Sequence, residues 1–358
     1  MEANLFQQLT SRGNPLIRGT QVTLYWQGER TVSLMSDLHG WEDPQKLRRL
    51  PVRLAPPGGP PLWAISFSLP RDAYMEYYFH DPATGGRLLD PYNARTVSNG
   101  LGARNNFFHM PESIPTPLTR RRAGVPHGEV RRVMVPAGLL AEDGQREVHL
   151  YAPPVKERTP LLVVYDGTDY LQRGRLTNIV DNLIAEKRIR PLALAFLQNG
   201  GRYRSVEYAG SDAVINWIDM EVLPLARREL NLLGIRRNPG AYGVLGASFG
   251  GVMAVYTGLR MPETFGRVIC QSGAFELDGR DLSAADLIRH GHAHERLKLW
   301  MDVGRFDSLL SDNRRMQPIL KKNGYDVTYR EFSAGHNYTA WSDEVWRALE
   351  ALFPARAI

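Results

Sequence analysis

Apolar positions divide the chain into two regions with different periods. After residue 128, short apolar runs alternate with longer stretches in which apolar residues recur at helical spacing. The runs predicted as strands lie near 130–135, 147–152, 161–165, 192–197, 241–245, 268–271, 297–303 and 327–331. The stretches predicted as helices lie near 175–186, 213–229, 251–260, 312–322 and 343–352. Strands that alternate with helices predict a mostly parallel sheet with helices on both faces.

The first region has a β-rich pattern. Its apolar runs are short, contain β-branched and aromatic residues, and lie at 22–26, 31–35, 62–67 and 75–79 between turn residues. This pattern predicts a small all-β sandwich of the immunoglobulin-like (E-set) type. Prolines and arginines then crowd into a stretch without an apolar period. We therefore predict a sandwich domain over 1–112, a linker over 113–127 and an α/β domain over 128–358.

The most informative motif lies in the second region. An apolar run leads into Gly246-Ala247-Ser248-Phe249-Gly250, a G-x-S-x-G pattern, and an apolar helix follows. Strand, sharp turn and helix in this order are typical of the nucleophile elbow of an α/β-hydrolase. We predict Ser248 as the nucleophile and the N–H of Phe249 as one donor to the oxyanion. The alternative is a glycine-rich turn whose serine caps a helix.

A serine nucleophile needs a base, and the base needs an acid that orients it. In α/β-hydrolases the chain order is serine, acid, histidine, each on a loop after a strand. His336 follows the last predicted strand and precedes the C-terminal helix, so we predict it as the base. Asp307 lies on the loop after the preceding strand and is the predicted acid, with Asp302 as the alternative.

The second oxyanion donor is expected after an early central strand. The run at 161–165 ends in Asp166-Gly167-Thr168, so we predict a backbone N–H of Gly167 or Thr168 as this donor. A plain Asp-Gly turn without a catalytic role is the alternative.

Several motifs together resemble those of the enterochelin (ferric siderophore) esterases, a family of esterase D-like α/β-hydrolases. They are Tyr165-Asp166-Gly167, Asn199-Gly200-Gly201-Arg202-Tyr203-Arg204 with Glu207-Tyr208, Leu223-Pro224, Gly246-Ala247-Ser248-Phe249-Gly250-Gly251, Gly304-Arg305-Phe306-Asp307, Gly335-His336 with Trp341, and Asp90-Pro91-Tyr92-Asn93. The resemblance covers nearly the whole chain, including the sandwich. It implies hydrolysis of the serine-ester backbone of a catecholate siderophore such as enterobactin, inside the cell, with release of iron.

The resemblance also directs attention to groups that bind the substrate. Arg202, Arg204 and Arg305 lie on loops expected at the carboxyl edge of the sheet, where they could pair with an anionic ferric catecholate. Trp341 is a further candidate contact. The alternative is that these arginines pair with neighbouring carboxylates such as Glu207 and Asp307.

Composition and charge narrow the class of protein. The chain has 358 residues, of which 43% are hydrophobic and 23% charged, as in a soluble globular protein. A formal charge of +6 suits an anionic ligand, but the basic residues are dispersed and no nucleic-acid motif appears. The segment Met1–Leu9 lacks a basic start and an apolar core, and no apolar run is long enough to span a membrane. We therefore expect a cytoplasmic protein with a small-molecule substrate and neither a nucleic-acid nor a membrane partner; the oligomeric state stays open.

Some residues suggest other chemistry. The single cysteine, Cys270, lies in an apolar run and is predicted to be a core residue. The alternating histidines of His290-Gly291-His292-Ala293-His294 could share one face as metal ligands, but hydrolysis by a serine needs no metal or cofactor and we predict none. Trp26, Trp41 and Trp63 could form a sugar-stacking face, although a small β-domain uses aromatic residues in its core more often.

Two other functions remain open. Relatives of this fold with a sandwich domain cleave feruloyl or acetyl esters of plant polysaccharides, so a carbohydrate esterase is the first alternative. The second is a hydrolase fold that has lost activity and binds a glycan or a protein.

Overall fold

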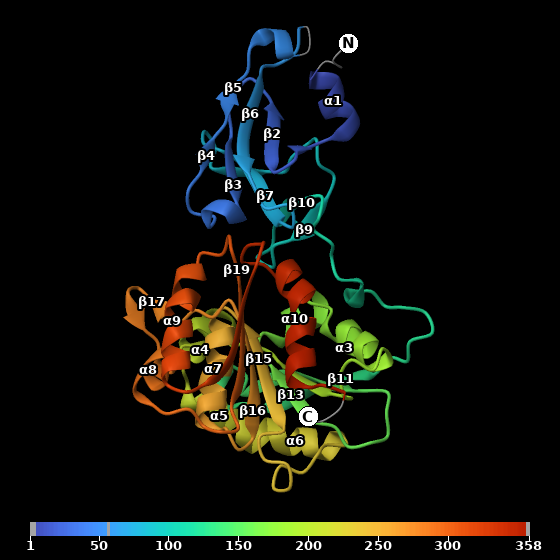
Figure 1. Ribbon diagram of the computed structural model, residues 1–358, viewed down its shortest axis with the longest axis vertical. Helices are drawn as coiled ribbons and strands as arrows, with labels where there is room; N and C mark the ends of the chain where they lie inside the picture. Colours follow the sequence, from blue (N-terminus) through green and yellow to red (C-terminus); the bar gives the residue numbers. More distant parts are fainter. Residues whose placement is uncertain (1–4, 56–57, 356–358) are drawn as a thin grey trace. The chain divides into compact units, whose positions relative to one another are not determined.

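The computed structural model describes residues 5–55 and 58–355 of the chain. Met1–Asn4, the start of the segment Met1–Leu9 considered above, lie outside the described residues. The chain forms two compact units, whose helices and strands are labelled in Figure 1. Unit 1 consists of Met1–Pro115 with Gly304–Ser308 and Phe332–Asn337, and unit 2 of Thr116–Val303, Leu309–Glu331 and Tyr338–Ile358. The apolar pattern did not predict that two short later segments would group with the N-terminal region.

Unit 1 contains two β-sheets with a shared core. One has the strand order β1–β2–β6–β5 and the other β4–β3–β7–β10–β9, with β8 paired to β7. The elements are α1 (Leu5–Arg12), β1 (Leu16–Arg18), β2 (Gln21–Gln27), β3 (Ser33–Ser36), β4 (Gln45–Lys46), β5 (Arg48–Arg49), β6 (Leu62–Ser68), β7 (Tyr74–Asp81), β8 (Gly86–Leu88), β9 (Thr96–Ser98) and β10 (Arg104–His109). Val22 and Leu24 of β2 are buried with Met75, Tyr77 and Phe79 of β7, because alternate residues of a strand share a face. The predicted sandwich is confirmed.

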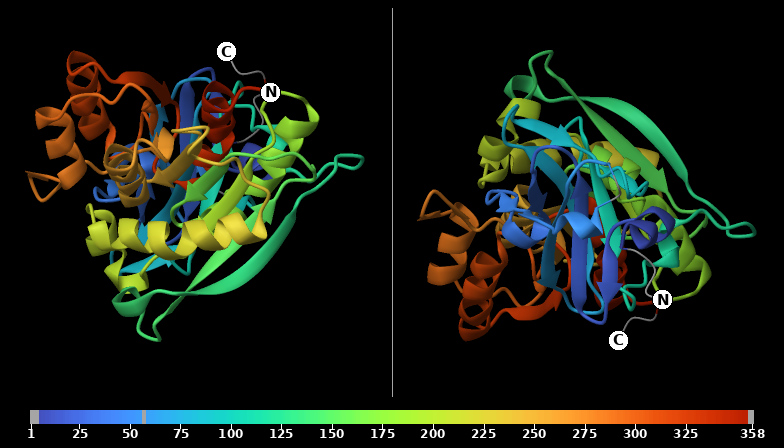
Figure 2. Two further views of the ribbon diagram at one scale, coloured as in Figure 1. Left: turned by 90° about the horizontal axis from the view of Figure 1, so that it is seen from below. Right: turned by 90° about the horizontal axis from the view of Figure 1, so that it is seen from above.

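Unit 2 is built on an eight-stranded sheet with the order β11–β12–β14–β13–β15–β16–β19–β20. Its strands are β11 (Glu129–Pro136), β12 (Gln145–Ala152), β13 (Leu161–Val164), β14 (Ala193–Leu197), β15 (Tyr242–Ala247), β16 (Phe265–Gln271), β19 (Lys298–Gly304) and β20 (Asp326–Phe332). β14, β13, β15, β16 and β19 run parallel, whereas β11 and β12 form an antiparallel hairpin along one edge, shown in green in Figure 2. The α/β-hydrolase fold predicted from the apolar runs is confirmed.

Helices pack on both faces of this sheet. They are α2 (Gly167–Gln172), α3 (Leu176–Ala185), α4 (Arg204–Tyr208), α5 (Asp212–Trp217), α6 (Leu223–Glu229), α7 (Phe249–Arg260), α8 (Ser283–His290), α9 (Leu310–Lys322) and α10 (Tyr338–Leu352). Val163 and Tyr165 share a core with residues of α5 to α9, while the intervening Val164 points to the other face. Figure 1 shows α3 and α10 side by side, and the two helices are in contact. The predicted helix 213–229 is interrupted by a π-helical turn at Ile218–Val222, next to Pro224, which lacks a backbone N–H.

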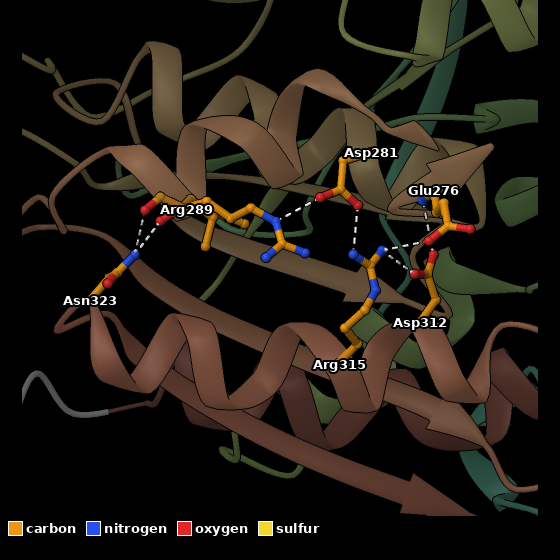
Figure 3. A network of polar contacts seen from close by, with 7 residues as sticks. Glu276, Asp281, Arg289, Asp312, Arg315 and Asn323 are labelled. Atoms are coloured by element: carbon orange, nitrogen blue, oxygen red, sulfur yellow. Dashed lines mark hydrogen bonds and ion pairs between the residues drawn. The ribbon is translucent and has the colours of Figure 1, made fainter. Parts of the chain in front are cut away.

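The segment between β16 and β19 carries a small hairpin, β17 (Glu276–Leu277) and β18 (Arg280–Asp281), that the apolar pattern missed. Arg315 of α9 holds this hairpin through ion pairs with Glu276 (3.2 Å) and Asp281 (2.6 Å), and it also pairs with Asp312 of its own helix (2.6 Å). Asp281 also accepts a hydrogen bond from Arg289 of α8 at 2.6 Å, as Figure 3 shows. Ion pairs and hydrogen bonds between arginine and carboxylate side chains therefore connect the hairpin to both α8 and α9.

The predicted linker is attached to α3. Leu118 is buried, and its carbonyl accepts a hydrogen bond from Asn182 Nδ2 at 2.7 Å. Arg122 Nε donates to Asn182 Oδ1 at 2.7 Å, and its guanidinium pairs with Glu186. The sequence pattern could not predict this attachment, because it rests on hydrogen bonds and an ion pair of individual polar side chains.

Candidate active site

Ser248 lies between β15 and α7 in a strained backbone conformation, with φ 59° and ψ −127°. L-residues avoid this region, so the surrounding structure must enforce it. Ser248 N donates to Gln271 O at 2.9 Å, and Ser248 O accepts from Gly251 N at 3.0 Å and Ala274 N at 3.2 Å. These bonds hold the partly exposed serine at the carboxyl end of β15, as a nucleophile elbow requires.

Glycine is required where the elbow is tightest. A Cβ atom at Gly246 would lie 2.0 Å from the carbonyl oxygen of Gly250, far inside van der Waals contact. The strand and the helix therefore approach each other so closely that a side chain at Gly246 cannot be accommodated. This explains the first glycine of the G-x-S-x-G pattern.

The predicted oxyanion donors follow neighbouring strands of the sheet. α7 begins at Phe249 and α2 begins at Gly167, and the first N–H groups of a helix have no partner within it. β13 and β15 are adjacent, with Tyr165 N donating to Leu245 O at 2.8 Å. The N–H groups of Phe249, Gly167 and Thr168 thus follow the carboxyl ends of paired strands. The sequence predicted the turn at Gly167 but not that it begins a helix.

Asp166 fixes this turn. It has a left-handed backbone with φ 50°, and its side chain is buried. Arg204 Nε and Nη2 donate to its two carboxylate oxygens at 2.7 and 2.6 Å, and Asn199 Nδ2 donates at 2.7 Å. Burial opposes the charge of Arg204, but the bonds to Asp166 raise the pKa of Arg204 overall. A Cβ atom at Gly250 would lie 2.9 Å from Asp166 Oδ2, so the carboxylate lies against the start of α7.

His336 and Asp307 are joined in unit 1. His336 Nδ1 lies 3.0 Å from each carboxylate oxygen of Asp307. The Asp307 side chain is fully buried, whereas that of His336 is 29% exposed. The pair has the geometry in which an acid orients a base and stabilises its protonated form. Ser248 and the predicted oxyanion donors belong to unit 2.

Asp302, the alternative acid, has other partners. Its carboxylate is buried and accepts hydrogen bonds from Trp300 Nε1 at 2.8 Å and Gln271 Nε2 at 3.3 Å. Burial raises the pKa of Asp302 to about 7. The geometry therefore favours Asp307 over Asp302 as the partner of His336.

The predicted substrate-binding arginines have protein partners in this structure. Arg204 is held by Asp166, as described above, and Arg202 pairs with Glu142 at the surface. Arg305 Nη1 donates to Ser333 Oγ at 3.2 Å and is exposed. The carboxylates expected as alternative partners, Glu207 and Asp307, instead contact Arg146 and His336.

Trp341 is a buried residue of α10. Its side chain is 3% exposed, and its Nε1 donates to Ser272 Oγ at 3.0 Å. A contact between this indole and a ligand would require it to be uncovered, so the structure does not favour Trp341 as a binding residue.

The remaining candidates from the sequence have structural roles. His290 ends α8, and His294 Nε2 lies 3.4 Å from Glu263. Within residues 5–55 and 58–355, no group of three His, Cys, Asp or Glu residues is placed to hold a metal ion. Cys270 is buried in the core of unit 2, and burial raises its pKa.

The tryptophans of unit 1 also pack within the protein. Trp26 packs on Phe79, Trp63 Nε1 donates to Gly28 O at 2.9 Å, and Trp41 stacks on Tyr78.

Sequence reasoning missed the residues that support the predicted site. Asn199 and Arg204 converge on Asp166, although the sequence placed Asn199 only within a family motif and Arg204 only as a contact to the substrate. The sequence signal that could have indicated these supporting residues is a cluster of polar residues within six positions after a strand. Only the tertiary structure shows that they share one partner.

Comparisons with known proteins agree with the fold. The family model described as "Putative esterase" matches residues 141–352. The iron(III) enterobactin esterase of Dickeya dadantii is 24% identical over 94% of this chain and 89% of its own length. The crystal structure of the enterobactin esterase of Shigella flexneri in the presence of enterobactin superposes with a TM-score of 0.77 at 19% identity and covers 98% of this chain and 99% of its own. A ferulic acid esterase of Anaeromyces mucronatus covers 68% of this chain and 97% of its own, with a TM-score of 0.57 at 18% identity.

The fold and the elbow define an α/β-hydrolase. The chain belongs to the esterase family that matches residues 141–352, and it is a carboxylic ester hydrolase by that membership. No helix in the part of the chain that the structure describes is long and apolar enough to cross a membrane.

Proposed function

We propose that this chain is a serine esterase that hydrolyses the ester backbone of a catecholate siderophore such as enterobactin, through an acyl-enzyme on Ser248. The observation that carries the substrate class is the extent of the similarity. Enterobactin esterases match both units, whereas the ferulic acid esterase of Anaeromyces mucronatus covers 68% of the chain. A substrate that needs the sandwich is therefore favoured over one that needs the hydrolase fold alone.

In the proposed mechanism, His336 Nε2 removes the proton from Ser248 Oγ as this oxygen attacks the ester carbonyl carbon. Asp307 accepts a hydrogen bond from His336 Nδ1–H, so the proton of the neutral ring is on Nδ1 and the lone pair of Nε2 acts as the base. The oxyanion that forms is stabilised by backbone N–H groups of Phe249 and of Gly167 or Thr168.

Collapse of this intermediate completes the transfer. The ester C–O bond breaks, and the departing alkoxide takes the proton from His336. Water then attacks the acyl-enzyme in the same manner, with His336 again as base, and releases Ser248. Iron enters as part of the substrate, and the proton transfers need no metal or cofactor.

The substrate class is tested by rates of hydrolysis on a panel of esters. The panel contains enterobactin with and without ferric iron, its linear serine-ester trimer, a feruloylated sugar and a p-nitrophenyl ester. We expect the highest kcat/KM on the siderophore esters. Rapid cleavage of the feruloylated sugar with no activity on enterobactin would establish the carbohydrate esterase alternative instead.

The same panel tests the inactive alternative, because a binding protein without activity would cleave none of the esters. A cytoplasmic location accords with a substrate that releases iron after uptake, and fractionation of cells that express the chain tests it. The strained Ser248 and the His336–Asp307 pair support an active enzyme.

A further inference from the structure

The loop that carries His336 is fastened inside unit 1 from more than one side. Arg305 N donates to Phe332 O at 2.8 Å and Phe306 N to Ala334 O at 3.0 Å, which joins this loop to the one that carries Asp307. Tyr74 N, at the start of β7, donates to Ser333 O at 3.0 Å. The sandwich strand β7 therefore bonds directly to the backbone of the histidine loop.

Asp37 is the second attachment. It follows β3 and is fully buried. Asp37 Oδ2 accepts hydrogen bonds from Glu76 N at 2.8 Å and from Asn337 Nδ2 at 3.3 Å, and Oδ1 accepts from Trp41 Nε1 at 3.2 Å. One carboxylate thus links the sandwich to the residue that follows His336.

Gly335, the residue before His336, lies against the same carboxyl group. A Cβ atom at position 335 would lie 2.2 Å from Asp37 Cγ and 2.3 Å from Asp37 Oδ1. Asn337 N donates to Gly335 O at 3.2 Å, so the backbone makes a tight turn with His336 at its centre. Asp37 therefore contacts both residues that flank the base.

Burial of this carboxyl group has a cost. Burial first, and then the charge of Glu76, raise the pKa of Asp37 well above its usual range. Asp37 and Glu76 are both almost completely buried, which lowers the stability of the folded protein. Asp37 therefore fixes the turn at His336 at a cost in stability.

We propose that Asp37 of the sandwich is a positioning residue for His336, acting through Asn337 and Gly335, so that the N-terminal region sets the orientation of the base. The inference rests on the proposed role of His336 in ester hydrolysis. Asp37 itself touches neither the imidazole nor Asp307 in the hydrogen bonds described above. Its effect is to fix the turn whose central residue must reach the reacting oxygen, and a displacement of about 1 Å in such a group costs on the order of 10²-fold in rate.

The test compares Asp37→Ala with Asp90→Ala in the full-length protein. Asp90 is a matched control, because it is a second buried carboxylate of unit 1 that accepts hydrogen bonds from Tyr77 and Asn14 and has none to the histidine loop among the bonds described. We expect Asp37→Ala to lower kcat on a p-nitrophenyl ester about 10- to 100-fold with KM within about twofold. Asp90→Ala is expected to lower the melting temperature but to leave kcat within about twofold.

Rescue of kcat by a conservative variant and an NMR signal of His336 distinguish a positioning role of Asp37 from a role in stability alone. Asp37→Asn keeps the volume and one acceptor oxygen, so it should recover most of kcat even if Asp37→Ala fails to fold. The deshielded Nδ1 proton of His336 in the NMR spectrum should shift or broaden in Asp37→Ala and not in Asp90→Ala. Equal kcat in the two alanine variants, or an unchanged Nδ1 signal in Asp37→Ala, would overturn the proposal.

A double-mutant cycle tests the route through Asn337. If Asp37 acts through this side chain, Asp37→Ala and Asn337→Ala combined should be no more than about twofold slower than the slower single variant. If the fold losses in kcat of the two single variants multiply in the double variant, Asp37 does not act through Asn337. Failure of the proposed function itself has a different signature, since Ser248→Ala would then retain activity whatever Asp37 does.

Discussion

His336 Nδ1 lies 3.0 Å from both carboxylate oxygens of Asp307, and this carboxylate is fully buried while the imidazole is 29% exposed. The arrangement holds one ring nitrogen inside the protein and leaves part of the ring accessible. Burial of the acid also strengthens its interaction with a protonated imidazole, because water screens the pair less. Asp307 is therefore suited to orient a base.

Replacement of the nucleophile should abolish turnover. We expect Ser248→Ala to lower kcat on the order of 10³-fold or more, because no acyl-enzyme can form. A phosphonate probe should label the wild type once and the variant not at all, as measured by intact-protein mass spectrometry. Equal labelling of the two proteins would show that another residue is the nucleophile.

Replacement of the acid and the base should give graded losses. His336→Ala should match Ser248→Ala, whereas Asp307→Ala should lose less, because the acid orients and stabilises without bonding to the substrate. Asp302→Ala is the matched control, since the bonds of Asp302 are to Trp300 and Gln271. Steady-state kinetics on a p-nitrophenyl ester measures all three, and a crippled Asp302→Ala beside a normal Asp307→Ala would reverse the assignment.

Arg204 and Arg202 should respond differently to removal. The sequence predicts that both select an anionic substrate, but Arg204 holds the buried Asp166 and Arg202 pairs with Glu142 at the surface. Arg204→Ala leaves Asp166 without two charged hydrogen bonds, each worth about 1.5–3 kcal/mol, so it should impair catalysis on charged and neutral esters alike. Arg202→Ala should change the kinetic parameters on either substrate only slightly.

A rise in KM for the siderophore in either variant, with an unchanged KM for the p-nitrophenyl ester, would support the prediction from the sequence that these arginines select an anionic substrate. In that case the siderophore KM should also rise with salt, because screening weakens exposed charge pairs.

Asp302 should make stability depend on pH. Its pKa is raised to about 7 in the folded protein, mainly by burial, while an unfolded aspartate has its ordinary pKa near 4. The folded state therefore binds a proton that the unfolded state has lost between these values. The stabilisation is fully present below about pH 4 and is lost as pH rises to about 7, at up to ~1.4 kcal/mol for each unit of pKa difference.

The Asp302→Asn variant removes this dependence. The free energy of unfolding of the variant minus that of the wild type should become more positive as pH rises from 4.5 to 7.5, as measured in urea titrations. A constant difference between the two proteins across this range would show that Asp302 does not change its protonation there.

Much of the fold followed from local patterns. All eight strands of the sheet in unit 2 were predicted, and the central parallel strands were predicted most directly, because strands buried on both faces are continuous apolar runs such as Leu161–Val164. The elbow at Ser248 was also predicted, since its first glycine, Gly246, is required by a contact with Gly250, four residues away. Boundaries differed by one to five residues; α10, for example, begins at Tyr338, five residues before the predicted start at 343.

The pairing of His336 with Asp307 could be predicted in part. Chain order and loop position selected the two residues, because both follow the last strands of the sheet. The sequence left Asp302 as an alternative, and only burial and side-chain direction distinguish the two aspartates.

The tertiary structure alone decided which polar groups meet. Asp37 and Asn337 are 300 residues apart, and the partners of Arg204, Arg202 and Asn182 lie on other elements. The apolar period determines which face of an element is buried, but the sequence around a charged or amide side chain does not indicate which distant residue it contacts. The sequence by itself therefore determined the sheet, the sandwich and the elbow, whereas the packing of the chain decided how the base is held.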